Sequence, residues 1–502
     1  MHSPRPRAGR DRTLIIGAGV GGLAAAADLA RRGVPVTVLE AAASPGGKMR
    51  EEPVAGRPVD AGPTVFTMRW VFESLFADAG RSLADYLTLA PAGILARHAW
   101  TEGGTLDLHA DIDRSVEAIA DFAGAREAAG YRDFCRRSAE IYRTLREPFI
   151  EGQRPSPFEL TRRVGLRRLG ALWRTAPHET LWHALSRHFR DPRLRQLFAR
   201  YSTYCGSSPL AAPATLMLVA HVEQEGVWLV EGGMRRVADA LCRLGAELGV
   251  EYRFSAPVDR LEIAGGRVAG VTLAGGEHLA ASAVVFNGDV AALAAGRLGV
   301  EARAAAPAVP REARSLSAMT WCLDTTTGGL PLERHNVFFA PNYPREFRAI
   351  FGSRSITEQP TVYVCAQDRG GDRKPDGRER LLVLVNAPPD GDRRIFDPAS
   401  VRVTGERVLA VLRACGVEFA GGLDEGVVTT PADFEVLFPA SGGALYGRAN
   451  HGTFASFGRP GARSRVPGLY LAGGSVHPGP GVPMAALSGR LAAQCVAADV
   501  AR

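Results

Sequence analysis

One stretch, residues 13–40, constrains the fold of this 502-residue chain more than any other. An apolar run at 14–16 predicts a buried strand, and the pattern from 23 to 32 predicts a helix. A second strand is expected at 36–39, with Glu40 directly after it. This strand–helix–strand order is typical of the start of an α/β domain built on a parallel sheet.

Three glycines connect the first strand to the helix, at the G-x-G-x-x-G spacing. Gly17 permits the tight turn, Gly19 has no side chain to keep a pyrophosphate from the backbone, and Gly22 lets the helix pack on the sheet. The helix N-terminus then offers free N–H groups to phosphates, and Glu40 is placed to accept hydrogen bonds from ribose hydroxyls. The stretch predicts a dinucleotide site. A glycine-rich turn without a ligand is the alternative, which the complete strand, helix and acid context disfavours.

The composition indicates a globular protein, with 46% hydrophobic and 23% charged residues. Seven cysteines are scattered without a C-x-x-C pair, which argues against a disulfide framework or a zinc site and for a reducing compartment. We expect no metal. The net charge of +7 comes almost entirely from arginine, a bias that codon composition explains, and we expect no nucleic-acid partner. No uncharged apolar run has the length of a membrane-spanning helix.

The chain divides into three stretches of one dinucleotide domain and two inserts. The domain is expected from residues 1–75, 228–295 and 461–502. The insert at 76–227 is mainly helical in pattern, and the insert at 296–460 mixes strands with helices.

The second and third stretches carry further expected elements. They are a helix through 237–248, a strand at 250–254, a β-meander of 258–263, 268–273 and 283–286, a strand within 468–473 and a closing helix at 485–500.

Three further motifs narrow the type of dinucleotide. Residues 43–48 add a glycine pair and Lys48, which is either a phosphate contact or a solvated cation. Residues 60–64 contain a Gly-Pro turn, which suits backbone beside a flat flavin ring or is an ordinary turn. Residues 471–484 place glycines and prolines before the closing helix, whose dipole can face a flavin. A nicotinamide enzyme has no need of the second glycine pair, so FAD is favoured.

Together these motifs resemble the FAD-dependent carotenoid desaturases of the bacterial phytoene desaturase type. The resemblance spans nearly the whole chain, and residues 62–70 are most similar to the hydroxyneurosporene and methoxyneurosporene dehydrogenase branch, the 1-hydroxycarotenoid 3,4-desaturases. It implies a Rossmann-like FAD-binding domain assembled from three segments, an inserted α+β substrate domain and a helical part that associates with membranes.

The resemblance also implies which residues contact FAD. They are Gly17, Gly19, Gly22, Glu40, Gly47, Lys48, Gly62, Val258, Gly474, Val482, Pro483 and Met484.

The implied reaction removes a hydride to the flavin and a proton from adjacent carbons of a long apolar polyene. The polyene delocalises developing charge, so the protein mainly supplies positioning and a dry pocket. His477, in the C-terminal loop, is the best-placed base, and a purely structural hydrogen bond is its alternative. Asp60 is a second candidate, which equally suits pinning its turn.

A carotenoid substrate implies entry from a membrane surface. Residues 154–200 hold eleven arginines, from Arg154 to Arg200, among Phe, Leu and Trp, with three acids. This pattern suits anionic headgroups or, equally, a solvated basic face. We expect a cytoplasmic protein bound peripherally to the inner or intracytoplasmic membrane.

Other functions stay open at this point. They are a phytoene desaturase of the same family, an FAD-dependent amine or protoporphyrinogen oxidase, and a non-enzymatic carotenoid carrier. Oxygen and a membrane quinone are both possible electron acceptors.

Overall fold

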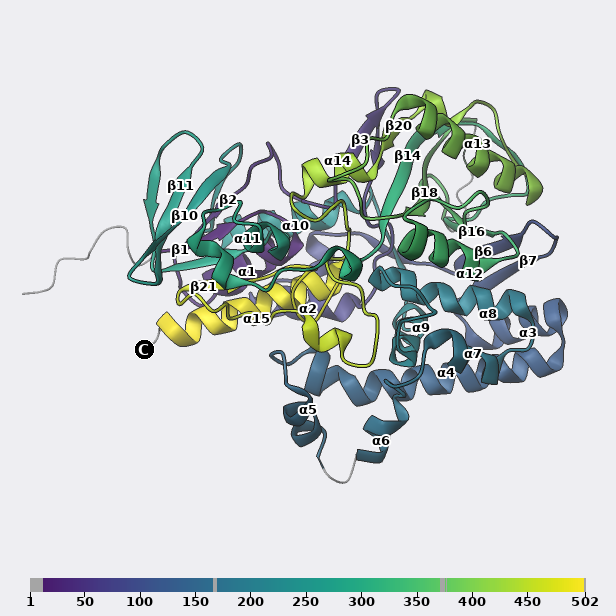
Figure 1. The fold of residues 1–502 in the computed structure, drawn as a ribbon, viewed down its shortest axis with the longest axis horizontal. Coiled ribbons are helices and arrows are strands. Elements are labelled where there is room, and N and C mark those ends of the chain that lie inside the picture. Colours follow the sequence, from purple (N-terminus) through teal and green to yellow (C-terminus); the bar gives the residue numbers. More distant parts are fainter. Residues whose placement is uncertain (1–11, 166–168, 371–374, 376, 501–502) are drawn as a thin grey trace, which may run out of the picture.

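The computed structural model describes residues 12–165, 169–370, 375 and 377–500. Figure 1 shows a part built on a parallel sheet at the left, a part built on a larger mixed sheet at the upper right, and a layer of helices below it. Mixed sheets covered by helices make this an α/β protein, as the sequence predicts.

A five-stranded parallel sheet forms the core of the left-hand part. In spatial order its strands are β21 (Leu469–Leu471), β13 (Ala283–Phe286), β1 (Thr13–Ile16), β2 (Val36–Leu39) and β9 (Glu251–Arg253). In the register of the sheet, Ile15 lies between Val285 and Val38. The apolar runs of β1 and β2 are buried because both faces of the sheet are covered. Ile15 and Val38 pack in one cluster with Leu23 and Leu241, and Leu14 and Leu39 pack in another with Leu261 and Val271. The sheet thus draws its strands from three distant stretches of chain.

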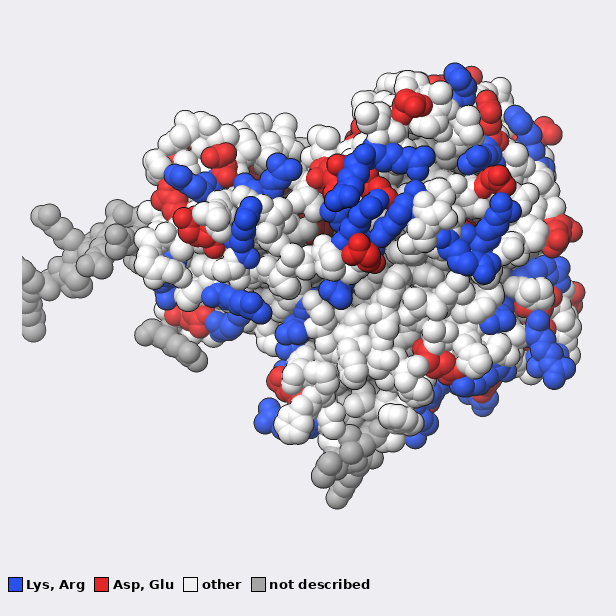
Figure 2. Space-filling view, viewed as in Figure 1, with Lys and Arg blue, Asp and Glu red and all other residues white. Residues whose placement is uncertain are grey.

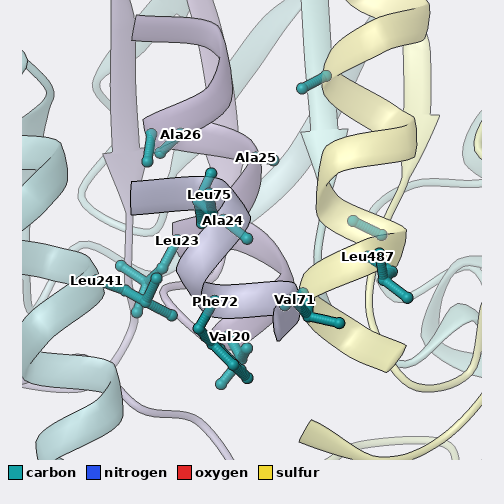
Figure 3. Packing of buried hydrophobic residues seen from close by; sticks show 14 of the residues in the cluster. Val20, Leu23, Ala24, Ala25, Ala26, Val71, Phe72, Leu75, Leu241 and Leu487 are labelled. Atoms are coloured by element: carbon teal, nitrogen blue, oxygen red, sulfur yellow. The ribbon is translucent and has the colours of Figure 1, made fainter. Parts of the chain in front are cut away.

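Four helices pack around this sheet. They are α1 (Val20–Ala30), α2 (Arg69–Asp78), α10 (Arg235–Glu247) and α15 (Val482–Val500). Figure 3 shows α1 between Leu241 of α10 and Leu487 of α15, with Phe72 of α2 in the same cluster. The backbones of α1 and α15 approach closely, because a Cβ added at Gly489 would lie 2.0 Å from the carbonyl oxygen of Gly21.

The observed β-meander differs from the expected one in its last strand. Its members are β10 (Val258–Ala264), β11 (Arg267–Leu273) and the short β12 (His278–Ala280), which form a separate three-stranded antiparallel sheet. The predicted third strand is β13, and it belongs to the parallel sheet instead. All four residues of β13 are buried, which fits the centre of a covered sheet rather than an exposed meander.

The upper right-hand part is built on a seven-stranded sheet. In spatial order its strands are β20 (Val427–Thr429), β14 (Ser317–Thr325), β18 (Glu379–Ala387), β17 (Val362–Ala366), β16 (His335–Phe339), β6 (Ile94–Trp100) and β7 (Thr105–His109). Helices α12 (Tyr343–Arg348) and α13 (Pro398–Ala414) belong to the same part. Strands β6 and β7 precede the helical layer in sequence, and β6 pairs in parallel with β16. The first insert is therefore not wholly helical, and it shares a sheet with the second.

The helical layer lies below that sheet in Figure 1. Its helices are α3 (Ile112–Ala123), α4 (Ala125–Leu145), α5 (Pro157–Val164), α6 (Leu169–Arg174), α7 (Leu181–His188), α8 (Pro192–Ala199), the 3-10 helix η4 (Arg200–Cys205) and α9 (Leu218–Gln224). Aromatic rings fix the packing of α4 on α8, since the ring centroids of Phe134 and Phe198 are 4.7 Å apart. Helices α5 and α6 project from the lower edge. Within the described ranges, no helix has the length and apolar character needed to cross a bilayer.

Shorter elements complete the fold. They are the pairs β3 (Glu51–Val54) with β4 (Arg57–Asp60), β5 (Leu89–Pro91) with β8 (Trp228–Val230) and β15 (Thr327–Gly329) with β19 (Val417–Phe419), and helices α11 (Val290–Ala294) and α14 (Pro431–Leu437). The β3–β4 hairpin is tied to the large sheet, because Arg57 forms ion pairs with Asp324 at 3.2 Å and Asp368 at 2.9 Å.

Candidate functional site

A cavity of about 1360 Å³ is lined by the loops that follow strands of the parallel sheet, by residues of the seven-stranded sheet and by the helical layer. It exceeds the roughly 300–1,000 Å³ of an ordinary small-molecule pocket. Its lining begins at the glycine loop before α1, passes residues 46–50 and 61–68, and ends at α5 and α6. A cavity of this size and reach accommodates two occupants, one at the glycine loop and another toward the helices.

The glycine loop has the geometry that its spacing predicts. Gly17 has φ +99, the left-handed region, where the strand turns toward α1. A Cβ at Gly22 would lie 2.1 Å from the carbonyl oxygen of Gly17, so this glycine permits the contact between helix and loop. Gly17 and Gly19 line the cavity, whereas Gly22 lies behind it. The third glycine therefore supports the loop rather than touching a ligand.

Glu40 braces the same loop. Its Oε2 accepts a hydrogen bond from the backbone N–H of Ala18 at 2.6 Å, and its Oε1 accepts one from Ala42 at 2.8 Å. Each carboxylate oxygen has a further lone pair, so Glu40 can still accept bonds from hydroxyl groups in the cavity that it lines. Val258, predicted on the adenine side, is not among the lining residues.

The second glycine motif packs directly on the first. The N–H of Gly46 donates to the carbonyl of Ala18 at 2.9 Å, and a Cβ at Gly47 would lie 3.2 Å from the Cα of Gly19. Gly47 is exposed and lines the cavity, so its backbone extends the surface that the glycine loop offers to a ligand.

Lys48 and Gly62 close one wall of the cavity. The Lys48 ammonium donates to the carbonyl of Leu445 at 2.6 Å and lies over the ring of Phe438 at 4.9 Å. Burial lowers the pKa of Lys48, and the carboxylate of Asp289 opposes that shift. These contacts support a role in the cavity wall over the predicted phosphate contact. A Cβ at Gly62 would lie 1.9 Å from the carbonyl oxygen of Lys48, so only glycine fits there.

The C-terminal motif ends at the N-terminus of α15. Gly474 and the first residues of α15, Val482, Pro483 and Met484, all line the cavity, so the positive end of the helix dipole faces it. Arg459, which is 2% exposed, holds this segment by donating to the carbonyls of Gly474, Tyr446 and Arg448. No sequence motif marks Arg459, because it is one arginine among many.

His477 supports the loop from behind. It is 2% exposed and does not line the cavity. Its Nε2 lies 3.0 Å from the carbonyl of Gly152, and its ring packs edge-on against Phe149 with centroids 4.9 Å apart. Burial lowers the pKa of His477 to about 4, so the ring is neutral near pH 7 and Nε2 donates the bond. This placement favours the structural alternative.

Asp60 also lies outside the cavity lining. Its carboxylate accepts hydrogen bonds from the backbone N–H groups of Met234, at 2.8 Å, and Arg235, at 3.4 Å, at the start of α10. The side chain of Gln367 clamps the Asp60 backbone with two bonds of 2.9 Å. Burial raises the pKa of Asp60, although these amides act against the rise. The geometry favours pinning of the turn over proton removal.

Sequence reasoning missed a group of polar side chains in the cavity wall. Arg200, Tyr204 and Glu223 line the cavity, although Arg200 was counted with the basic residues expected to face a membrane. No motif marks these positions, because the three side chains meet only through the turn between α8 and α9.

The far end of the cavity opens at α5 and α6. Leu160, Leu172 and Trp173 are among its lining residues. Trp173 is 71% exposed and the neighbouring Phe158 is 81% exposed. Residues 166–168 of the basic stretch lie outside the described residues. The cavity thus joins a glycine-rich cradle to an apolar mouth.

Comparison with known proteins identifies the family. The model of the family "Flavin containing amine oxidoreductase" matches residues 20–497. The hydroxyneurosporene desaturase of Rubrivivax gelatinosus is 54% identical over 97% of this chain and 94% of its own length. The protein of that name from Cereibacter sphaeroides is 47% identical, with 98% of each chain covered.

Among solved structures, putrescine oxidase bound to putrescine has a TM-score of 0.60 at 16% identity, covering 98% of this chain and 99% of its own. At that identity the likeness concerns the fold alone. Cyclohexylamine oxidase from Brevibacterium oxydans is similar at a TM-score of 0.58. With a matching family model over most of its length and relatives above 40% identity, the chain belongs to the flavin containing amine oxidoreductase family.

Proposed function

We propose that this protein is an FAD-dependent carotenoid desaturase that introduces the 3,4 double bond into 1-hydroxy- or 1-methoxycarotenoids. Full-length relatives named hydroxyneurosporene desaturase, at 42–54% identity, support this substrate type. The observation that carries the proposal is the continuity of the cavity. It runs from the glycine loop to exposed Trp173, so a long apolar molecule can enter at one end and meet a flavin inside.

The residues present fit FAD. The cradle of Gly19, Gly47 and Gly62 has no room for side chains at its closest approaches, and Glu40 lines the cavity with lone pairs that a ribose would need. The first turn of α15 presents free backbone N–H groups to the cavity beside the glycine loop, because a Cβ at Gly21 would lie 3.0 Å from the carbonyl oxygen of Ala485. When bound, FAD supplies the oxidising power by accepting a hydride.

The protein's own part is to orient the polyene and to exclude water. The cavity wall beyond the cradle is mainly apolar, with Leu160, Leu172, Val219, Leu382 and Leu384 among its side chains. Neither His477 nor Asp60 reaches this wall. The demand on a base is small, since an extended polyene spreads the charge that develops as hydrogen leaves.

The mouth of the cavity is proposed to rest on a membrane surface. Exposed Phe158 and Trp173 lie at α5 and α6, and Phe454, which is 65% exposed, also lines the cavity. Arg162 and Arg163 follow on α5. In Figure 2 a broad area without charged side chains covers the lower middle of the molecule and leads toward this edge. Aromatic and basic side chains together suit an anionic bilayer. Oxygen or a membrane quinone would reoxidise the flavin.

The test is anaerobic reduction of the purified holoenzyme. We expect 1-hydroxyneurosporene to bleach the flavin absorbance and to yield a product with one more conjugated double bond. Phytoene and putrescine serve as the comparison substrates. Bleaching by phytoene alone would move the protein to another branch, and bleaching by putrescine alone would make it an amine oxidase.

A further inference from the structure

A buried ionic cluster interrupts the apolar wall of the cavity. Arg200 and Tyr204 lie on η4, and Glu223 lies on α9. Nη2 of Arg200 donates to the Tyr204 hydroxyl at 3.1 Å, and that hydroxyl donates to Oε1 of Glu223 at 3.0 Å. The Tyr201 hydroxyl donates to the other carboxylate oxygen. Glu223 is 6% exposed, so the carboxylate is held in place from two sides.

Arg200 has donors left over. Its hydrogen bond to Tyr204 engages one of its five N–H groups, and among the described residues its buried Nε has no partner. Burial works against the charge, but Tyr204 and Glu223 outweigh burial and raise the pKa of Arg200, so the guanidinium stays charged. Arg200 and Tyr204 are partly exposed, and both side chains line the cavity. An acceptor inside the cavity would satisfy free N–H groups of Arg200, and the Tyr204 hydroxyl, which donates its proton to Glu223, keeps one lone pair for a hydroxyl donor.

Contacts connect the segment that carries the cluster to the segments expected around the flavin. A Cβ at Gly206, next to η4, would lie 2.5 Å from the ring of Tyr446, whose neighbour Leu445 receives the Lys48 hydrogen bond. Thr64 of the Gly-Pro turn and Tyr363 also line the cavity, and their hydroxyls share a hydrogen bond of 2.7 Å. Burial raises the pKa of Tyr363, and the charge of Arg200 acts against that rise.

We infer that Arg200 and Tyr204 bind the oxygen substituent of the substrate and thereby select oxygenated over purely hydrocarbon carotenoids. This inference rests on the proposed function. In a 1-hydroxycarotenoid a single carbon separates the hydroxylated carbon from the C3–C4 bond, so the oxygen lies roughly 3–4 Å from C3. The group that binds this oxygen must therefore lie beside the reacting bond, and the contacts of η4 with the segments expected around the flavin suit that position. Glu223 acts as a positioning residue that orients Tyr204.

A hydrocarbon end in the same place would remove water from Arg200 without replacing its hydrogen bonds. An unpaired buried donor is costly, and sites built to bond a substrate hydroxyl reject analogues that lack it. We expect the natural selectivity for the hydroxylated substrate over neurosporene to be at least roughly 10- to 100-fold.

The experiment compares Tyr204→Phe and Arg200→Met with the unchanged holoenzyme. Tyr142→Phe is the matched control, because Tyr142 is a buried tyrosine that does not line the cavity. Each protein is titrated with 1-hydroxyneurosporene and with neurosporene, and kcat and KM are measured for both. The Kd of the desaturated product is measured separately from the shift of its visible absorbance.

The expected result is a loss of roughly 10- to 100-fold in kcat/KM for the hydroxylated substrate alone, with weaker product binding. Turnover of neurosporene should not fall, and it should rise in Arg200→Met, where no donor is left unpaired. Equal losses for both substrates, or unchanged selectivity, would overturn the inference. If the unchanged enzyme reduces its flavin with neither carotenoid, the proposed function itself fails. Tyr142→Phe is expected to keep the selectivity of the unchanged enzyme.

Discussion

The Lys48 ammonium donates a 2.6 Å hydrogen bond to the backbone carbonyl of Leu445, and this bond joins the second glycine motif to the C-terminal part of the chain. Lys48→Met removes the donor and leaves a carbonyl in the wall without its partner, at a cost of about 1–3 kcal/mol. We expect a lower thermal midpoint and faster loss of flavin on dilution, measured by flavin fluorescence. Lys48→Arg keeps a donor, so its thermal midpoint should lie between those of Lys48→Met and the unchanged protein. Equal stability of Lys48→Met and the unchanged protein would contradict this role.

Gly62→Ala should prevent normal closure of the cradle. The added Cβ would meet the carbonyl oxygen of Lys48 at 1.9 Å, and overpacking of this kind costs about 1–3 kcal/mol or more. The ratio of flavin absorbance to protein absorbance after purification is expected to fall. Gly93→Ala is the control, because nothing lies within 4 Å of its added Cβ. A full flavin complement in Gly62→Ala would show that the turn shifts freely.

His477 should give the protein a dependence on acid. Burial lowers the pKa of His477 to about 4 in the folded state, below the ordinary 6.5. Between these two pH values the unfolded chain binds a proton at His477 and the folded chain does not. Its contribution is complete above pH 6.5 and falls by about 2 kcal/mol as the pH drops from 7 to 5. In His477→Gln the thermal midpoint should fall less over this range. His98, His335 and His451 act in the same direction, since burial lowers the pKa of each.

The same variant separates the structural from the catalytic interpretation of His477. A structural histidine predicts an unchanged pH profile of kcat in the protein that retains flavin. Loss of an ionisation from that profile would restore His477 as a proton acceptor.

Phe158→Ser should weaken binding to anionic vesicles. Removing a large apolar side chain from a membrane interface costs about 1.5–3 kcal/mol, which is roughly a 10-fold loss of partitioning or more. Co-sedimentation with vesicles that contain phosphatidylserine measures this loss. Ile395→Ser is matched to it, since Ile395 is 87% exposed on the other insert. If Phe158→Ser and Ile395→Ser both sediment with vesicles to the same extent as the unchanged protein, α5 is not the docking element.

Local sequence patterns predicted the cradle well. The turn at Gly17 and the contact of Gly22 with the loop follow from spacing, because each depends on residues close in the chain. The parallel strands also follow from their apolar runs. The assignment of 283–286 to the meander was wrong, because strand order depends on partners far away in sequence.

The parts of the site that depend on long-range contacts were not predictable in this way. Asp60 and His477 stand in motifs beside the cavity, yet their side chains point to backbone groups of other segments. Arg200 reads in sequence as one more basic residue, and only the meeting of η4 with α9 gives it Tyr204 and a cavity to face. The substrate-binding wall therefore needed the structure.

The order of strands in the parallel sheet has a consequence for the growing chain on the ribosome. The outer edge of β13 pairs with β21, which is synthesised long after it, and α15 follows later still. Until then the nascent chain has an unpaired, apolar strand edge, which is prone to aggregate and can be bound by chaperones. Because Gly474 and α15 form part of the cradle, flavin can be captured only after these last elements have been made.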